Sequence, residues 1–240
     1  MTGHAGGPPP GSEGAAAPAP GQQNGTVATI MRRRSVRADF TERTPPNSVV
    51  RQIVQAGLAA PSAKNAQPWR LHVVRDPGLI AWISEQMMAA PGREEFVPVD
   101  PLSGQPHPGH VSTVAASAAV IAAVPLVIVV ESLEPFSSAA SGARAPGADQ
   151  FAIRLDAFAV GAAVQNMWLA ATSFGLAGVF LADAAVASDA IVPRLGLKGA
   201  LFGALALGYS RVDATPPMNA ALLPEIERAV WHGDSDVDRV

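Results

Sequence analysis

The sequence predicts an α+β fold in which helices surround a small central sheet, and three observations support this class. The 240 residues are enough for one large domain with a sizeable buried core. Segments with the apolar period of a helix and short strand-like segments both occur along the chain. The two kinds do not alternate in the strict strand–helix rhythm that a parallel sheet requires.

The N-terminal segment 1–24 is predicted to be a disordered tail. Gly, Pro and Ala supply 16 of its 24 residues, and it carries a single acidic charge and no aromatic residue. Such a segment cannot bury enough apolar area to offset its chain entropy. Residues 25–240 are therefore expected to form one domain.

Helix signals open this domain and recur along it. Thr26 is placed as the N-cap of a short helix, and Asn47 or Ser48 as the N-cap of a second helix that must end before Pro61. Further helices are predicted over 79–90, 111–123, 151–173, 188–195 and 224–231. The helix 151–173 is apolar on nearly every face, which is typical of a helix in a core or in an oligomer interface.

Strand signals are shorter than the helix signals. In "WRLHVV" (69–74), apolar and polar residues alternate, which predicts a strand with one buried face. Apolar runs predict further strands at 125–130, 178–182 and 201–209. Two stretches rich in Pro, Gly and Ser, 91–110 and 137–149, are expected to be irregular loops.

Composition excludes several classes of function. The net charge of −3 and the pI of about 5.9 argue against a nucleic-acid-binding protein, which would carry a broad basic field. No cysteine is present, so thiolate metal sites and cysteine nucleophiles are excluded. His107 and His110 have no carboxylate cluster with ligand spacing beside them, so no metal is expected. The N-terminus lacks the features of a secretory signal, so we expect a cytoplasmic protein.

Two uncharged stretches, 111–130 and 158–182, are long enough to be tested as membrane spans. The first contains Pro125, and it is better explained by a helix followed by a strand. The second has Gln165 and Asn166 near its centre. Neither stretch is flanked by an excess of Lys or Arg on one side, so no membrane insertion is expected.

The segment "RRRSVR" (32–37) concentrates four of the 17 Lys and Arg residues in six positions. Guanidinium groups form bidentate hydrogen bonds with phosphate, and a neighbouring Ser hydroxyl adds a donor. Taken alone, such a cluster is more often a solvated basic turn. Another part of the chain must therefore decide between these two interpretations.

A second segment, "APSAKNAQPW" (60–69), places polar side chains between a predicted helix and a predicted strand. Pro61 ends the helix, and Ser62, Asn65 and Gln67 follow it. Polar side chains on a loop fixed by prolines suit a heterocyclic ligand with several donors and acceptors. An ordinary helix-to-strand connection is equally compatible with these residue types.

Together, the two segments resemble the paired motifs of the flavin-dependent nitroreductase family. Downstream, "AAVPLVIVV", "RLDAFAVGAAVQNMWLAATSFGLAG" and "ALALGY" are similar to the family's helix-to-strand step, long central helix and late strand. The resemblance covers residues 27 to 210 approximately. The first two motifs are specific as a pair, whereas the later ones are weak because they are mostly apolar.

The resemblance implies a mostly antiparallel sheet, an intertwined homodimer and two FMN sites at the dimer interface. The residues that match the flavin-binding positions are Arg33, Arg34, Ser35, Arg37, Pro61, Ser62, Asn65 and Gln67. Arg33 and Ser35 would hold the FMN phosphate. Arg37 would lie nearer the pyrimidine edge of the ring, where its charge would stabilise the reduced flavin. Part of the second motif would reach the flavin of the partner subunit.

The activity implied by the resemblance is that of an FMN-dependent oxidoreductase. NADH or NADPH would reduce the flavin in a ping-pong cycle, and a small-molecule substrate would reoxidise it. That acceptor would be a nitroaromatic, a quinone, an enone or a biosynthetic intermediate. No side chain is assigned as catalytic, because the cofactor carries the hydride. The alternative is a binding or regulatory protein that keeps the fold without redox turnover.

The chain departs from the family pattern in two places. Many members have a basic residue after the late strand that completes the phosphate site, and here Met218 and Asn219 stand at that place. The contact would then come from Arg211 or Arg228. The polar residue that commonly touches the flavin pyrimidine is not identifiable within 84–110.

Overall fold

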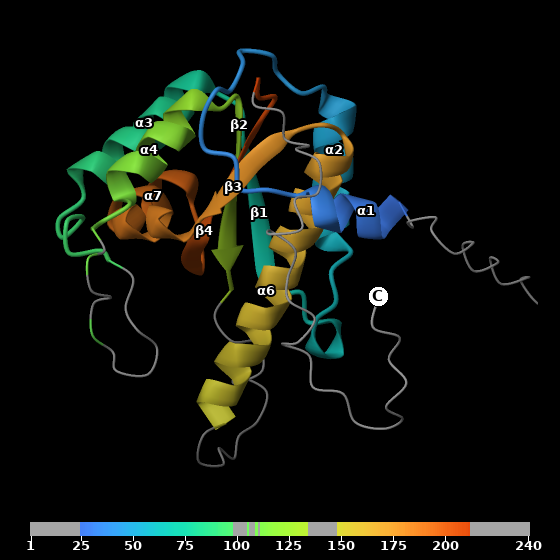
Figure 1. The fold of residues 1–240 in the computed structure, drawn as a ribbon. Helices are drawn as coiled ribbons and strands as arrows, with labels where there is room; N and C mark the ends of the chain where they lie inside the picture. The colour runs from blue at the N-terminus through green and yellow to red at the C-terminus, as the bar shows by residue number, and fades with distance from the viewer. Residues whose placement is uncertain (1–24, 98–104, 106–108, 110, 134–147, 212–240) are drawn as a thin grey trace, which may run out of the picture.

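The computed structural model describes residues 25–97, 105, 109, 111–133 and 148–211 (Figure 1). Several sequence predictions lie outside these residues: the tail 1–24, the helix 224–231, the pair His107 and His110, and most of the loop 137–149. None of the helices in the described part of the chain is long and apolar enough to cross a bilayer.

Four antiparallel strands form one sheet in the order β1–β2–β4–β3. Their bounds are Trp69–Val74 (β1), Leu126–Ser132 (β2), Ala177–Leu181 (β3) and Ala200–Gly208 (β4). The central strands β2 and β4 are buried along most of their length, which explains why they are nearly continuous apolar runs in the sequence. The predicted α+β class with a small antiparallel sheet is confirmed.

Helices cover both faces of this sheet (Figure 1). On one face pack α2 (Asn47–Leu58) and the long helix α6 (Ala148–Ser173), with α1 (Gly25–Arg32) lying against α6. On the other face pack α3 (Pro77–Ala89), α4 (Val114–Ala123) and α7 (Ser188–Leu195). Each face has its own buried cluster, so the core consists of two layers separated by the sheet.

The edge strand β1 differs from its prediction, because each of its two faces is partly buried and partly exposed. Trp69 and Leu71 pack under α2 and α6, whereas Val74 belongs to the core under α3 and α4. Val73, which was expected to be buried, is 41% exposed. The simple alternation fails because helices cover each face of β1 only in part: Val74 is buried on one face, whereas Val73 on the other face is left exposed at the pocket beside α2.

The predicted helices are all present within the described residues, but their N-caps were predicted wrongly. α2 begins at Asn47 after Pro46, which has φ −60° and ψ 150° and makes no side-chain cap. The Asn47 side chain instead accepts a hydrogen bond from Arg75. α1 already includes Thr26. The fixed φ of proline defines the start of α2 without a polar cap.

Glu131 of β2, which is fully buried, links β1 and the turn before β4 to its own strand. Its Oε1 accepts hydrogen bonds from the backbone amides of Lys198 and Gly199, each at 2.6 Å. Its Oε2 lies 2.8 Å from Nε2 of His72 on β1. Burial alone would raise the pKa of Glu131, but the hydrogen bonds from His72, Gly199 and Lys198 outweigh burial and lower it.

We predict that Glu131→Gln destabilises the protein at pH 7 by about 1–3 kcal/mol. The pKa is lower in the folded than in the unfolded state, so the carboxylate stabilises the fold above about pH 4.3. That contribution is lost as the pH falls through the folded value. The melting temperature of the variant should therefore lie below that of the wild type at pH 7, and the difference should shrink as the pH is lowered to 3.5. The exposed Glu85→Gln is the control, and a constant difference at every pH would contradict the prediction.

Candidate functional site

The arginine-rich segment runs along the outer edge of the sheet. β3 is an edge strand, and Ser35 forms an isolated parallel bridge with Gly178 of β3. The amide of Val36 donates to the carbonyl of Gly178 at 3.0 Å, and the Val36 side chain is buried. In Figure 1 this segment runs directly from α1 to β3. The backbone at Ser35 and Val36 is therefore held against the edge of the sheet.

Gly178 makes the close approach of β3 to β4 possible. A Cβ atom added there would lie 2.1 Å from the carbonyl oxygen of Ala206 and 2.8 Å from a side-chain carbon of Leu207. Real Cβ atoms do not approach a backbone oxygen so closely, so another residue would force the strands apart.

Arg33 and Arg34 hold their guanidinium groups close to the protein. The Arg33 guanidinium carbon lies 4.3 Å from the centre of the Trp168 ring on α6. Nη1 of Arg34 donates to the carbonyls of Met31 at 2.6 Å and of Arg33 at 2.9 Å. Two buried nitrogens remain without a hydrogen-bond partner: Nη1 of Arg33 and Nε of Arg34.

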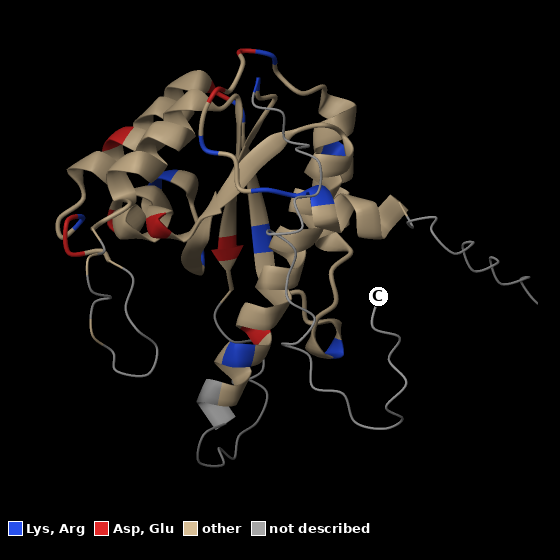
Figure 2. Cartoon of the chain, viewed as in Figure 1, with Lys and Arg blue, Asp and Glu red and all other residues tan. Residues whose placement is uncertain are grey.

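The electrostatics of this pair favour an anion. Burial, and next the positive charge of Arg34, lower the pKa of the Arg33 guanidinium below its usual value. Among the described residues, no carboxylate forms an ion pair with either arginine. Figure 2 shows the positive charge on the segment between α1 and β3. Because unpaired buried N–H groups are costly, a bound phosphate would satisfy them with charge-assisted hydrogen bonds.

Arg37 lies a few residues further along the same segment, at a pocket of about 470 Å³. The other residues that line this pocket are Phe96, Val97, Thr113, Ala116, Ser117, Phe180, Leu181, Ala182 and Asp183. This volume and this mixture of apolar walls with a few polar groups are typical of small-molecule sites. Phe96 and Val97 show where the segment 84–110 reaches the site, which the sequence did not reveal.

Sequence reasoning also missed a buried polar cluster in this pocket. Asp183 is only 8% exposed, and its Oδ2 accepts hydrogen bonds from the hydroxyls of Thr113 at 2.9 Å and Ser117 at 2.6 Å. The one available signal was a single acidic residue inside the apolar run "GVFLADAAVA" (178–187). An isolated Asp after a strand is too common to be assigned a role from sequence alone.

The second motif forms a loop whose backbone is unusual. Lys64, Asn65 and Gln67 adopt positive φ angles of 52°, 55° and 47°. Ser62 Oγ accepts a hydrogen bond from the Gln67 amide at 2.9 Å, which closes the loop. The side chains of Pro61, Asn65 and Gln67 are exposed. Non-glycine residues in this conformation are strained and often occur at ligand-binding sites.

The structure does not bring the two motifs together within one chain. In Figure 1, the loop between α2 and β1 lies beside the middle of α6, well away from the arginine segment on β3. A site that uses both motifs therefore requires a second subunit. The flavin-binding roles of Pro61, Ser62, Asn65 and Gln67 stay predictions.

The end of β4 lies next to the chain that continues from Arg37. Phe40 forms a bridge with Ser210, and the Arg211 amide donates to the Asp39 carbonyl at 2.9 Å. Of the two basic residues considered for the phosphate contact, Arg211 is thus placed beside this segment. Met218, Asn219 and Arg228 lie outside the described residues.

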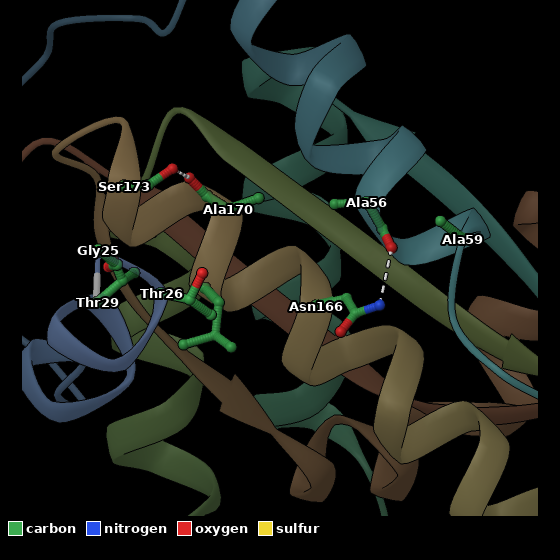
Figure 3. A pocket seen from close by; sticks show the side chains of 9 residues that line it. Gly25, Thr26, Thr29, Ala56, Ala59, Asn166, Ala170 and Ser173 are labelled. Carbon is green, nitrogen blue, oxygen red and sulfur yellow. Dashed lines mark hydrogen bonds between the residues drawn. The ribbon is translucent and has the colours of Figure 1, made fainter. Parts of the chain in front are cut away.

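A larger groove of about 680 Å³ lies between α1, α2 and α6 (Figure 3). Its walls include Thr26 and Thr29 of α1, Ala56 of α2 and Asn166 of α6. The side-chain amide of Asn166 donates a hydrogen bond to the Ala56 carbonyl at 3.1 Å. Among the described residues, its lining contains no titratable side chain. Those residues therefore supply no acid, base or charged ligand-binding group.

Comparison with protein families agrees with the geometry. The model of the nitroreductase family matches residues 30–209, which is most of the chain. The chain belongs to the nitroreductase family. This result agrees with the range of 27 to 210 approximately over which the sequence motifs resemble that family.

Solved structures in this family share the fold at low sequence identity. A nitroreductase with bound FMN from Desulfitobacterium hafniense matches with a TM-score of 0.63 at 21% identity, covering 88% of this chain and 100% of that chain. The NADPH:FMN oxidoreductase from Vibrio harveyi, complexed with NAD+, matches with a TM-score of 0.58 at 21% identity. The match covers 88% of this chain and 80% of that chain.

Curated relatives match over shorter segments. A protein named NADH dehydrogenase from Thermus thermophilus is 49% identical over 47 residues, which cover 20% of this chain and 22% of that protein. A protein from Archaeoglobus fulgidus named NADH dehydrogenase/NAD(P)H nitroreductase is 39% identical over 56 residues, which cover 23% of this chain and 32% of that protein. The chain therefore spans less than a third of the length of these two relatives in the matched segments.

We predict that Gly178→Ala weakens both the fold and the arginine site. The added Cβ must push β3 and β4 apart, which also shifts the backbone that pairs with Ser35, so we expect a loss of about 1–3 kcal/mol in unfolding free energy. Thermal melting measures the stability, and titration with inorganic phosphate measures the site. Gly25→Ala is the control, because a Cβ at that position meets nothing within 4 Å. Equal melting temperatures for the two variants would contradict the prediction.

Proposed function

We propose that this nitroreductase-family protein is an FMN-dependent oxidoreductase that uses NADH or NADPH to reduce a small organic acceptor. The observation that carries the proposal is the pair of unpartnered, buried guanidinium nitrogens on Arg33 and Arg34. They lie on the edge of the sheet that leads to the pocket at Arg37. The names of the Vibrio harveyi and Archaeoglobus fulgidus relatives support the same activity and electron donor. A cytoplasmic location is part of the proposal.

The arginine segment fits a phosphate group. Arg33 would donate from its free Nη1, Arg34 from its free Nε, and Ser35 from its exposed hydroxyl. Charge-assisted bonds of this kind contribute about 1.5–3 kcal/mol each. Because the Arg33 side chain already lies over Trp168, little side-chain entropy remains to be lost on binding.

The pocket at Arg37 fits the flavin ring. Bound FMN would supply the hydride chemistry between the nicotinamide donor and the acceptor. The protein's own residues would bind, orient and exclude water: Phe96, Phe180 and Leu181 provide apolar walls, and Arg37 provides positive charge at the ring. None of these side chains has to act as an acid or a base.

The proposal includes a homodimer that buries the outer face of α6. Phe151 and Phe158 are 65% and 68% exposed, and Ala162 and Leu169 follow on the same face at helical spacing. Leu169 also lines the groove of Figure 3, so the face runs into that groove. Large exposed aromatic side chains in a row mark an interaction surface. A second subunit there would bring its own loop 61–67 within reach of a shared site.

The alternative is a protein of this family that binds a ligand without redox turnover, and one spectrum separates the two. An enzyme should purify with FMN or take it up, absorb at about 450 nm, and lose this absorbance when NADH or NADPH is added without oxygen. A protein that ignores added FMN would overturn the proposal. A protein that binds FMN but is not reduced by either nucleotide would support the alternative.

We predict that Arg33→Ala lowers the affinity for FMN by ten- to a hundredfold, because it removes a charge-assisted phosphate contact worth about 1.5–3 kcal/mol. Fluorescence titration of the apoprotein with FMN measures this change. Arg32→Ala is the matched control, because this neighbouring arginine is exposed and has no assigned contact with the cofactor. Equal losses in the two variants would show that only the general positive charge matters.

We predict that Phe158→Glu converts the dimer to a monomer and lowers FMN occupancy at the same time. The substitution places a charge on the exposed face of α6, where it would be buried against the partner. Light scattering measures the mass, and absorbance measures the flavin. Met88→Glu, on a partly exposed position of α3, is the control. A wild-type protein that is monomeric with full FMN occupancy would contradict the dimer.

A further inference from the structure

Asp183 is a buried acid without a cationic partner among the described residues. It stands in the 3₁₀ turn Ala182–Ala187 that follows β3 directly, and it shares its pocket with Arg37. A buried carboxylate is costly unless hydrogen bonds or a counter-charge compensate it. Its place in a ligand-sized pocket therefore calls for an explanation beyond packing.

The hydroxyls of Thr113 and Ser117 fix the orientation of this carboxylate. Both hydrogen bonds end on Oδ2, at 2.9 Å and 2.6 Å, and Ser117 is itself buried. Within the described residues, Oδ1 has no hydrogen-bond partner. Two neutral donors orient the group without neutralising its charge. The carboxylate thus keeps an oxygen that can accept a further hydrogen bond, and its position is set by α4.

The pocket therefore presents two different polar groups: a guanidinium that only donates and a carboxylate that accepts. The remaining lining residues are mostly apolar. The pyrimidine edge of a flavin has an N–H group between two carbonyl groups, so it needs donors for its oxygens and an acceptor for its N–H. The two side chains match this edge in chemical type.

We propose that Asp183 is a positioning residue that accepts a hydrogen bond from the ring N–H of the cofactor, while Arg37 serves a ring carbonyl. This inference rests on the proposed function, because it assigns a role within the FMN site. It makes Thr113 and Ser117 the supporting residues that hold the carboxylate in place.

The charge of Asp183 has a second consequence. A fixed negative charge near the ring disfavours the negative charge that the flavin gains on reduction, so it lowers the midpoint potential of the bound flavin. Arg37 acts in the opposite direction. The potential of this flavin would then depend on the balance between one cation and one anion in the same pocket.

The test compares binding of FMN and of FMN methylated at the ring N–H, with wild type, Asp183→Ala and Asp183→Asn. Wild type should bind FMN at least tenfold more tightly than the methylated analogue. Asp183→Ala should bind FMN about tenfold more weakly and lose most of this preference. Asp183→Asn, which keeps the shape, should raise the midpoint potential of the bound flavin, measured against a reference dye.

Asp189→Asn is the matched control, because it removes the same charge from an exposed position on α7. Near-ultraviolet circular dichroism checks that the variants stay folded. If Asp183→Ala does not fold, the comparison of the two flavins is made with Asp183→Asn instead. Equal affinities of wild type for the two flavins, or an unchanged potential in Asp183→Asn, would overturn the role of Asp183 alone. A wild-type protein that binds neither flavin would overturn the FMN proposal as well.

Discussion

The pairing of one short segment with the edge of β3 is the contact on which the candidate site depends. A single hydrogen bond of 3.0 Å, from Val36 to Gly178, and the burial of Val36 fix a backbone that carries three arginines. Like charges at adjacent positions repel each other and would otherwise spread into solvent. Pairing with β3 therefore fixes the backbone that carries the arginines. The side chain of Trp168 on the long helix α6 contacts the Arg33 guanidinium.

This dependence explains how the two halves of the molecule divide their tasks. The layer of α2 and α6 supports the arginine segment and carries the exposed aromatic face, whereas α4, from the opposite layer, contributes to the pocket wall around Asp183. Glu131 locks the turn between α7 and β4 to the sheet from within. The site thus lies where both layers meet the outer edge of β3.

Much of this architecture could be predicted from sequence, because the relevant signals are local. Apolar period and proline positions placed the helices and strands, and the paired motifs pointed to the family. The errors have tertiary causes. Val73 is exposed although its strand alternates, and Asn47 binds Arg75 instead of capping its helix. Asp183 was missed because its partners, Thr113 and Ser117, are about 70 positions away along the chain. No local sequence pattern predicts a contact between residues so far apart in the chain.

The loop at residues 64–67 has a consequence for how this protein can change. Three non-glycine residues there hold left-handed backbone conformations, and each costs about 1–2 kcal/mol relative to a relaxed one. Glycine at Asn65 or Gln67 would remove the cost but also the exposed polar side chain. A selection for thermal stability would favour glycine at these positions, and a selection for ligand binding would keep Asn and Gln. The two selections would therefore drive this loop toward different sequences.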